Sequence, residues 1–239
     1  MEETKKILVL GDSILKGIQV DPETGKYIIK NEIDALGLET EFHLSIQNKS
    51  HFGATCINGD KLLNRLLNHG DHYDAVVMDF GGNDCNYDWA AVAADPTGEH
   101  FPIVPLADFL DRYRALIRRV KAHGMTPIVT TLPPLVPQRF FDWWCRDLDK
   151  AAVRHWLGCE CNIYAHQEKY SRTVERLAWE ERIPLVDIRG AFLENGRLGT
   201  LMCADGTHPN STGQTLITKA FRDFCHDWES HCMPSAFVS

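Results

Sequence analysis

Residues 7–13 read ILVLGDS, a short apolar run that ends at Gly11 and is followed at once by two polar residues, Asp12 and Ser13. A nearly continuous apolar run of this length is typical of a strand that is covered by helices on both faces. Gly11 permits a tight turn where the strand ends. The segment therefore predicts a buried strand with a polar loop at its carboxyl end.

Four more apolar runs have the same character, and stretches with helical spacing separate them. The further predicted strands are residues 42–46, 75–80, 127–132 and 183–188, and the predicted helices are 59–68, 105–123, 164–182 and the segment after Pro209. Strands that alternate with helices predict a three-layer α/β/α sandwich around a five-stranded parallel sheet, with right-handed crossovers. We expect one domain over residues 1–239, with a loose tail at 233–239.

The composition favours a soluble enzyme-sized domain over a nucleic-acid or membrane protein. The 239 residues carry a net charge of -8, and the basic residues form no block that would follow a phosphate backbone. No apolar stretch approaches the roughly 20 residues of a spanning helix, and the N-terminus lacks the features of a signal peptide. A cytoplasmic location is expected, with no nucleic-acid partner and no membrane insertion, while the oligomeric state stays open.

The eight cysteines predict neither a disulfide framework nor a metal site. Reduced thiols are expected in a chain of this size from the cytosol. Cys159 and Cys161 are the only close pair, and they lack the two-residue spacer and the second pair of ligands that zinc sites usually show. No metal and no cofactor is expected.

Polar residues that suit acyl transfer follow the predicted strands or precede the last helix. In an open parallel sheet, ligands bind outside the carboxyl ends of the strands. Ser13 is the candidate nucleophile, His208 the base that takes its proton, and Asp205 the acid that orients the histidine. The backbone N–H groups of Ser13 and Gly53 and the side-chain amide of Asn83 are the candidate oxyanion hole.

Each of these segments also has a plainer interpretation. Gly-Asp-Ser is an ordinary turn tripeptide, residues 81–84 could simply end a strand, and His208 could be a surface histidine near a helix N-terminus. The segment around Gly53 is the least specific, since Gly59 is an alternative candidate for the same oxyanion-hole position. Their occurrence together, in this order, is what favours catalysis.

The motifs resemble those of the SGNH or GDSL-type hydrolases. Gly-Asp-Ser at 11–13, an isolated glycine at 53, Gly-x-Asn-Asp at 81–84 and Asp-x-x-His-Pro at 205–209 span most of the chain. The resemblance implies that Ser13, Gly53, Asn83 and His208 are the four residues after which the family is named, with Asp205 as the triad acid. It also implies a flavodoxin-like sheet of strand order 2-1-3-4-5 and hydrolysis of esters or thioesters without a metal. Ile14 departs from the leucine that many members have at this position.

Two insertions, residues 85–104 and 134–163, are longer than ordinary connections and rich in aromatic residues. Tyr87, Trp89, Trp143 and Trp144 are candidate walls of a substrate pocket. The alternative for residues 140–144 is a short amphipathic helix that packs on the domain.

The sequence therefore predicts a serine hydrolase that cleaves carboxylic esters through an acyl-enzyme on Ser13, with small acylated compounds or acetylated carbohydrates as substrates. An acyltransferase, a thioesterase or a lysophospholipase would use the same triad. A non-catalytic binding module on the same fold is the alternative from another class.

Overall fold

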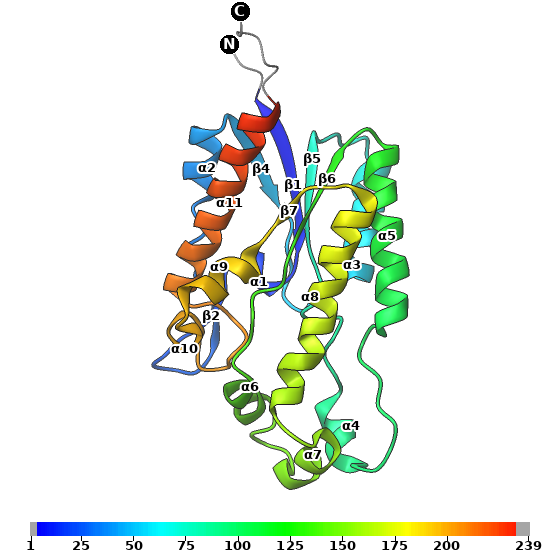
Figure 1. The fold of residues 1–239 in the computed structure, drawn as a ribbon, viewed down its shortest axis with the longest axis vertical. Coiled ribbons are helices and arrows are strands. Elements are labelled where there is room, and N and C mark those ends of the chain that lie inside the picture. The colour runs from blue at the N-terminus through cyan, green and yellow to red at the C-terminus, as the bar shows by residue number, and fades with distance from the viewer. Residues whose placement is uncertain (1–3, 233–239) are drawn as a thin grey trace, which may run out of the picture.

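A five-stranded parallel sheet forms the centre of the computed structural model, which describes residues 4–232. The predicted loose tail at 233–239 lies outside the described residues. The strands are β1 (Lys5–Gly11), β4 (Leu44–Asn48), β5 (Ala75–Asp79), β6 (Thr126–Thr130) and β7 (Leu185–Val186), in the spatial order β4-β1-β5-β6-β7. Numbered by their order among these five, the strands run 2-1-3-4-5, which confirms the predicted topology (Figure 1).

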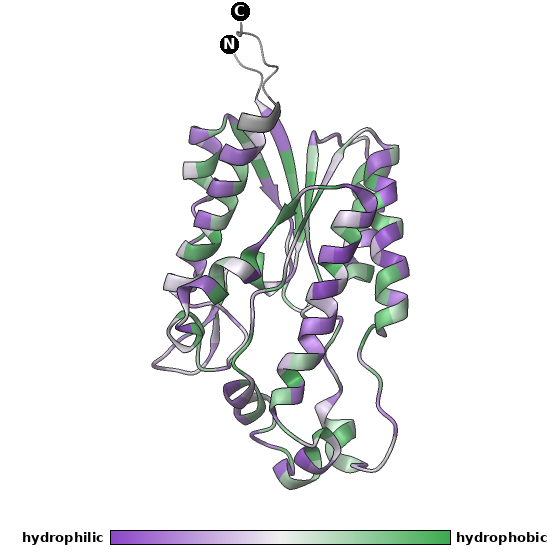
Figure 2. Ribbon diagram, in the orientation of Figure 1, coloured by the Kyte–Doolittle hydropathy of each residue, from purple (hydrophilic) through white to green (hydrophobic). Residues whose placement is uncertain are grey.

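Helices cover both faces of the sheet, as the continuous apolar strands predict. On one face lie α3 (Cys56–Asn68), α5 (Leu106–Ala122) and α8 (Cys161–Glu181), and on the other lie α9 (Ile188–Asn195) and α11 (Ser211–Cys232). Side chains alternate along a strand, so Leu8 and Leu10 of β1 pack under the first group while Val9 packs under the second. The helices turn apolar residues toward the sheet and polar residues outward (Figure 2).

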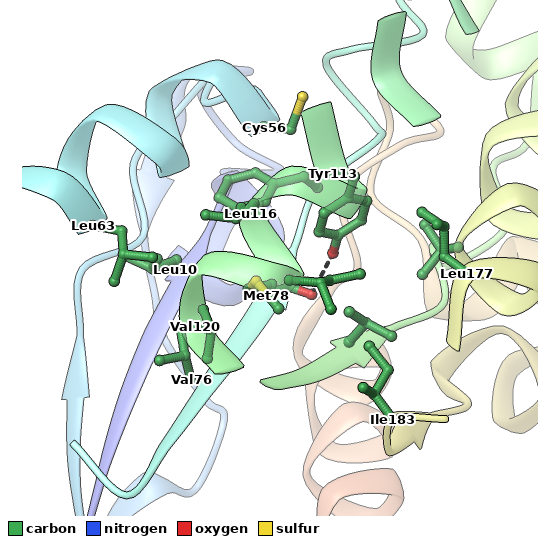
Figure 3. Close-up of a cluster of buried hydrophobic side chains, with 14 of the residues drawn as sticks. Leu10, Cys56, Leu63, Val76, Met78, Tyr113, Leu116, Val120, Leu177 and Ile183 are labelled. Carbon is green, nitrogen blue, oxygen red and sulfur yellow. Dashed lines mark hydrogen bonds between the residues drawn. The ribbon is translucent and has the colours of Figure 1, made fainter. Parts of the chain in front are cut away.

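The larger core cluster contains a polar group whose hydrogen bond is satisfied inside it. Tyr113 of α5 is fully buried, and its hydroxyl donates to the Met78 carbonyl oxygen of β5 at 2.8 Å (Figure 3). Leu116 and Val120 of the same helix and Leu177 of α8 fill the surrounding space. Such a bond avoids the cost of burying an unpaired hydroxyl, so α5 is held to β5 by both packing and hydrogen bonding.

The last predicted strand is wrong in its extent. Residues 183–188 are apolar except for Asp187, but only Leu185 and Val186 pair with β6. The Asp187 side chain accepts a hydrogen bond from the Gly190 N–H, which caps α9 and ends the strand. The apolar character of Ile188 reflects burial under α9 rather than a place in the sheet.

The structure also contains short elements that were not predicted from the sequence, and all of them except α2 lie toward the carboxyl ends of the strands. They are α1 (Ser13–Lys16), the antiparallel hairpin β2 (Ile18–Val20) and β3 (Tyr27–Ile29), α2 (Ala35–Glu41), α4 (Trp89–Ala94), α6 (Pro137–Trp144), α7 (Lys150–Leu157) and α10 (Leu198–Leu201). Among them, α4, α6 and α7 belong to the two aromatic insertions and lie below the sheet in Figure 1.

The insertions form a separate hydrophobic cluster. Trp89 of α4, Phe140 and Phe141 of α6 and Val153 of α7 are buried together with Ile163 at the start of α8. The amphipathic-helix interpretation of residues 140–144 is therefore correct for Phe140 and Phe141. Helix α8 contributes to this cluster with its first turns and to the main core with its later ones.

The expectation of reduced thiols is wrong for one pair. Cys159 and Cys161 are joined by a disulfide at the start of α8, with their Cα atoms 5.3 Å apart. The turn before the helix brings the side chains of these two residues together. Between residues 4 and 232, the structure contains no helix with the length and apolar character needed to cross a membrane.

Candidate active site

Ser13, His208 and Asp205 form a continuous hydrogen-bonded chain at the carboxyl end of the sheet. His208 Nε2 lies 2.8 Å from Ser13 Oγ, and His208 Nδ1 lies 2.5 Å from Asp205 Oδ2. Ser13 and His208 are 195 residues apart in sequence. The exposed fractions of the three residues are 6%, 3% and 0% in the order serine, histidine, aspartate. The structure thus brings together the residues predicted as nucleophile, base and orienting acid, with the geometry that proton transfer between them needs.

Ser13 is held at the first position of α1 by its neighbours in the Gly-Asp-Ser motif. The Asp12 side chain accepts a hydrogen bond of 2.8 Å from the Ile14 N–H and caps the helix. Gly11 allows the strand to approach its surroundings closely, because a Cβ atom there would lie 3.0 Å from Ser50 Oγ and 3.2 Å from Asp79 Cβ. The serine hydroxyl is therefore presented from a short, tightly packed strand-to-helix turn.

The turn that carries His208 is fixed by its own acid. Asp205 Oδ1 accepts hydrogen bonds of 3.1 Å from the backbone N–H groups of Thr207 and His208, while its other oxygen faces the imidazole. Gly206, which follows Asp205 in this turn, has φ +72°, and a Cβ atom there would lie 2.5 Å from the Val136 carbonyl oxygen. Only glycine fits, because the start of α6 rests directly on this turn.

Asn83 has a different arrangement from the one expected for an oxyanion-hole donor at rest. Its Nδ2 atom donates to the Asp12 carboxylate and to the Ala54 carbonyl oxygen, both at 3.0 Å. A side-chain amide has two hydrogens, so both are engaged in this structure. Asn83 thereby connects the loop after β5 to the Ser13 loop and to the segment that contains Gly53.

Gly53 lies next to the site without lining the cavity at Ser13. It is exposed and has φ +72°, and a Cβ atom there would have no protein atom within 4 Å. Its neighbour Phe52 lines the cavity, and Ala54 accepts the bond from Asn83. The positive φ gives a conformational reason for glycine at this position, and its role as an oxyanion donor stays a prediction.

Three buried carboxyl groups behind Ser13 were not anticipated from the sequence. Burial and the neighbouring Asp79 charge raise the pKa of Asp12 well above its usual value, burial raises the pKa of Asp79 to about 6, and burial raises the pKa of Asp84. The Asp79 side chain accepts from the Thr130 hydroxyl at 2.8 Å, and its second oxygen has no hydrogen-bond partner within the described chain. The pairing of Gly11 with Asp79 in adjacent strands explains why these acids meet.

Replacing Asp79 by asparagine is expected to stabilise the protein at pH 8 by about 1 to 3 kcal/mol and to have little effect at pH 4. The folded protein holds a proton on Asp79 up to about pH 6, whereas the unfolded chain releases it near pH 4. The buried charge therefore costs stability as the pH rises through that window, and asparagine removes this cost. Urea unfolding of the parent protein and of the Asp79→Asn variant, at pH 4 and at pH 8, measures this difference in the free energy of unfolding.

Asp147, whose side chain is 87% exposed, provides the control for the Asp79 experiment. Asp147→Asn should leave the difference in stability between the two pH values as it is in the parent protein. An equal effect of Asp79→Asn at pH 4 and pH 8 would contradict the assignment of a raised pKa.

One cavity opens at Ser13, and a second cavity adjoins it. The smaller one, about 60 Å³, is lined by Ser13 and His208 and by Phe52, Phe140 and Trp144. The larger one, about 240 Å³, has aromatic walls formed by Tyr87, Trp89, Phe140, Trp156 and the imidazole of His166. The two share Gly82, Asn86, Phe140, Gln167 and Thr207 as lining residues.

The four aromatic residues predicted as pocket walls are thus divided among three environments. Tyr87 and Trp89 line the larger cavity, and Trp144 lines the smaller one. Trp143 lines neither, and its indole N–H donates to the Tyr27 hydroxyl at 3.0 Å. Across the part of the chain that the structure describes, no group of three or more His, Cys, Asp or Glu side chains could hold a metal ion.

Comparison with known proteins links this geometry to a family. The GDSL-like Lipase/Acylhydrolase family matches residues 9–216 of the chain. An isoamyl acetate-hydrolyzing esterase from Saccharomyces cerevisiae is 27% identical over 220 residues, which cover 89% of this chain and 82% of the yeast protein.

Solved structures share the fold. A lipase/acylhydrolase from Enterococcus faecalis superposes with a TM-score of 0.66 at 18% identity, over 98% of this chain and 100% of the other. A catalytic mutant of an acetylxylan esterase from Geobacillus stearothermophilus gives a TM-score of 0.64 at 20% identity, over 94% and 95% of the two chains.

Proposed function

We propose that this chain, which belongs to the GDSL-like lipase/acylhydrolase family and is a carboxylic ester hydrolase, cleaves esters of short acyl groups, above all acetyl, through an acyl-enzyme on Ser13. The observation that carries the proposal is the buried hydrogen-bonded chain from Ser13 through His208 to Asp205. It supplies a nucleophile and a base that line one small cavity and, behind them, an orienting acid.

The proposed reaction proceeds in two acyl transfers. His208 Nε2 takes the Ser13 proton as Oγ attacks the ester carbonyl carbon, and the imidazolium then gives this proton to the departing alcohol oxygen. Water attacks the acyl-serine in the second step, and His208 again takes a proton and returns it to Ser13. Asp205 keeps the imidazole in the required tautomer and stabilises its protonated form.

The negative charge on the carbonyl oxygen needs donors near Ser13. The Ser13 N–H is at the first position of α1, where no partner exists within the helix. We assign the Gly53 N–H and the Asn83 amide as the other two donors. In this assignment, one Asn83 hydrogen leaves the neutral Ala54 carbonyl for the anionic oxygen, which is the stronger acceptor.

The sizes of the cavities support a short acyl group. The cavity at Ser13 measures about 60 Å³, far below the roughly 300 Å³ at which pockets for drug-sized ligands begin. The adjoining aromatic cavity is about four times as large. We therefore assign the acyl group to the smaller cavity and the alcohol portion to the larger one, where Tyr87, Trp89 and Trp156 offer flat apolar surfaces.

The relatives act on esters that fit this division. The yeast relative is described as hydrolysing isoamyl acetate, and the Geobacillus structure is that of an acetylxylan esterase. These two substrates share the acetyl group and differ in the alcohol. For this chain we propose acetyl esters of small alcohols or carbohydrates.

A panel of nitrophenyl esters from acetyl to octanoyl tests the proposal. We expect kcat/KM to be highest for the acetyl or propionyl ester and at least about tenfold lower for the octanoyl ester, because a long chain exceeds the small cavity. Acetylated sugars, an acetyl thioester and an added acceptor alcohol extend the panel to the alternative activities. A preference for octanoyl esters would contradict the assignment of the acyl group to this cavity.

Trp144→Ala should change the order of preference in that panel. Removing the indole enlarges the cavity at Ser13, so the ratio of kcat/KM for hexanoyl over acetyl esters should rise by about tenfold. Trp179→Ala is the matched control, since Trp179 is 81% exposed on the later turns of α8. An unchanged ratio in the Trp144 variant would show that another part of the structure limits acyl length.

A further inference from the structure

Tyr27 is the aromatic residue of the β2–β3 hairpin that reaches the catalytic histidine. Its ring meets the His208 ring edge-on, with centroids 5.3 Å apart and an angle of 65° between the planes. Its hydroxyl accepts a hydrogen bond of 3.0 Å from the Trp143 indole and faces the Asp205 carboxylate. Tyr27 lines neither cavity, so substrate binding does not account for these contacts.

We propose that Tyr27 is a positioning residue for the triad, which donates its hydroxyl hydrogen to Asp205 and fixes the plane of the His208 ring. The proposal rests on the proposed function, since it needs Asp205 and His208 to act as orienter and base. It extends the hydrogen-bonded chain by two residues, from the Trp143 N–H through the Tyr27 hydroxyl to Asp205.

The hydrogen bonds of Asp205 leave room for this donor. An ionised carboxylate has about four acceptor positions. Two backbone N–H groups occupy Oδ1 and His208 Nδ1 occupies Oδ2, which leaves one position on Oδ2. Asp205 is fully buried, and a buried charge with an empty acceptor position is costly. We assign this position to the Tyr27 hydroxyl, which approaches Asp205 from the side of the hairpin.

The ionisation of Tyr27 is consistent with a neutral donor next to a negative charge. Burial and then the Asp205 charge raise the pKa of the Tyr27 hydroxyl, so it keeps its proton across the working range. Arg146, whose guanidinium lies 4.8 Å from the Trp143 ring centroid, opposes this shift. The Cys203 thiol also faces Asp205, and burial raises its pKa.

Two rings together restrict the imidazole. The Phe52 ring stacks against His208 with centroids 6.0 Å apart and planes 15° apart, while Tyr27 closes the edge. Tyr27 and Phe52 also touch each other, with centroids 5.3 Å apart. Rotation of the histidine ring away from Ser13 would require both aromatic residues to move, so the ring is preorganised for proton transfer.

The contacts of Trp143 explain how the hairpin keeps its place. Trp143 donates to Tyr27 from α6, and α6 itself rests on the Asp205–His208 turn through the Val136 N–H, which donates to the Gly206 carbonyl oxygen at 2.8 Å. One helix therefore holds both the acid and the tyrosine that faces it. Weakening the Trp143 donor should weaken the Tyr27 donor in turn, because bonds in such a chain polarise one another.

The test compares Tyr27→Phe with the parent enzyme on nitrophenyl acetate. The variant keeps the ring and removes the hydroxyl, so we expect kcat to fall by about tenfold with KM unchanged. We also expect the acid limb of the kcat/KM profile to move to higher pH, because the Asp205 carboxylate then attracts the protonated imidazole more strongly. A residue that only packs the hairpin would not move this limb.

Four further variants complete the experiment. Trp143→Phe should lower kcat and move the acid limb to higher pH, in both cases by less than Tyr27→Phe does. The double variant with both substitutions should equal Tyr27→Phe alone. Tyr73→Phe removes a buried hydroxyl outside the site, one that donates to Gln47, and should behave like the parent enzyme. Ser13→Ala, measured in parallel, should be inactive.

The outcomes separate the two proposals. If Ser13→Ala retains activity, the proposed function fails. If Ser13→Ala is inactive while Tyr27→Phe has the kcat and the acid limb of the parent enzyme, only the role of Tyr27 is overturned.

Discussion

Ser13→Ala is expected to lower kcat for nitrophenyl acetate by at least about 10³-fold, because members of a triad act as a unit and no other hydroxyl within residues 4–232 is hydrogen-bonded to the His208 imidazole. The same substitution should abolish labelling by a fluorophosphonate, which reacts with an activated serine. Labelling measured by mass spectrometry identifies the modified residue. Heat-denatured protein should not be labelled, since the unfolded chain no longer brings the histidine to the serine.

Ser45 provides the matched control for that experiment, since it is an exposed serine on β4. Ser45→Ala should be labelled and should turn over substrate at the parent rate. Full activity in the Ser13 variant, or a fluorophosphonate adduct on a different serine, would overturn the assignment of the nucleophile.

Asn83→Ala is expected to lower kcat by about 10² to 10³-fold with a small change in KM. The amide is proposed to stabilise the oxyanion in the transition state, so its removal should affect the chemical step more than the binding of the ester. Its loss also removes the two hydrogen bonds to Asp12 and Ala54. Single-turnover acylation and the thermal unfolding midpoint, measured on the same variant, separate the catalytic from the structural consequence.

A lower unfolding midpoint with kcat within about threefold of the parent value would assign Asn83 a bracing role only. Gly53 and Ser13 would then be the remaining candidates for oxyanion donors. A loss of kcat at an unchanged midpoint supports direct stabilisation of the reacting oxygen.

The centre of the sheet could be predicted from the sequence because its long strands are apolar on both faces. A strand such as β5, with five buried residues in a row, has few alternatives. The hairpin β2–β3 could not be predicted, since its strands have three residues each and pair only with each other. Strand β7 was overestimated because Ile188 is buried by a helix, and burial alone does not distinguish a strand from a helix.

Site residues could likewise be predicted where they lie in a short sequence motif, but not where their role depends on contacts between distant segments. Ser13, Asp205 and His208 occur in short motifs, so local spacing is enough to identify them as candidates. Asp12 could have been found from the motif itself, but its contact with Asp79 depends on the register between β1 and β5. Tyr27 carries no signal in the sequence, because its meeting with His208 depends on how a short hairpin folds back over the sheet.

Trp143 and Trp144 illustrate why residue types alone could not define the pocket. Neighbouring side chains on a helix point about 100° apart. Only Trp144 therefore faces Ser13, while Trp143 faces the hairpin. Which of the two does so depends on how α6 sits on Gly206, and no pattern within residues 140–144 contains that information.

The hydrophobic cluster of the insertions has a consequence for how this enzyme could acquire new substrates. Catalytic groups extend from loops of the sheet, whereas several walls of the larger cavity, to which we assign the alcohol, extend from α4, α6 and α7, which bury their apolar residues in a cluster of their own. Helix α8 joins the two, with Ile163 in one cluster and Tyr170 in the other. Because α6 also holds the Asp205–His208 turn, changes confined to α4 and α7 are the ones expected to alter selectivity while the triad is kept.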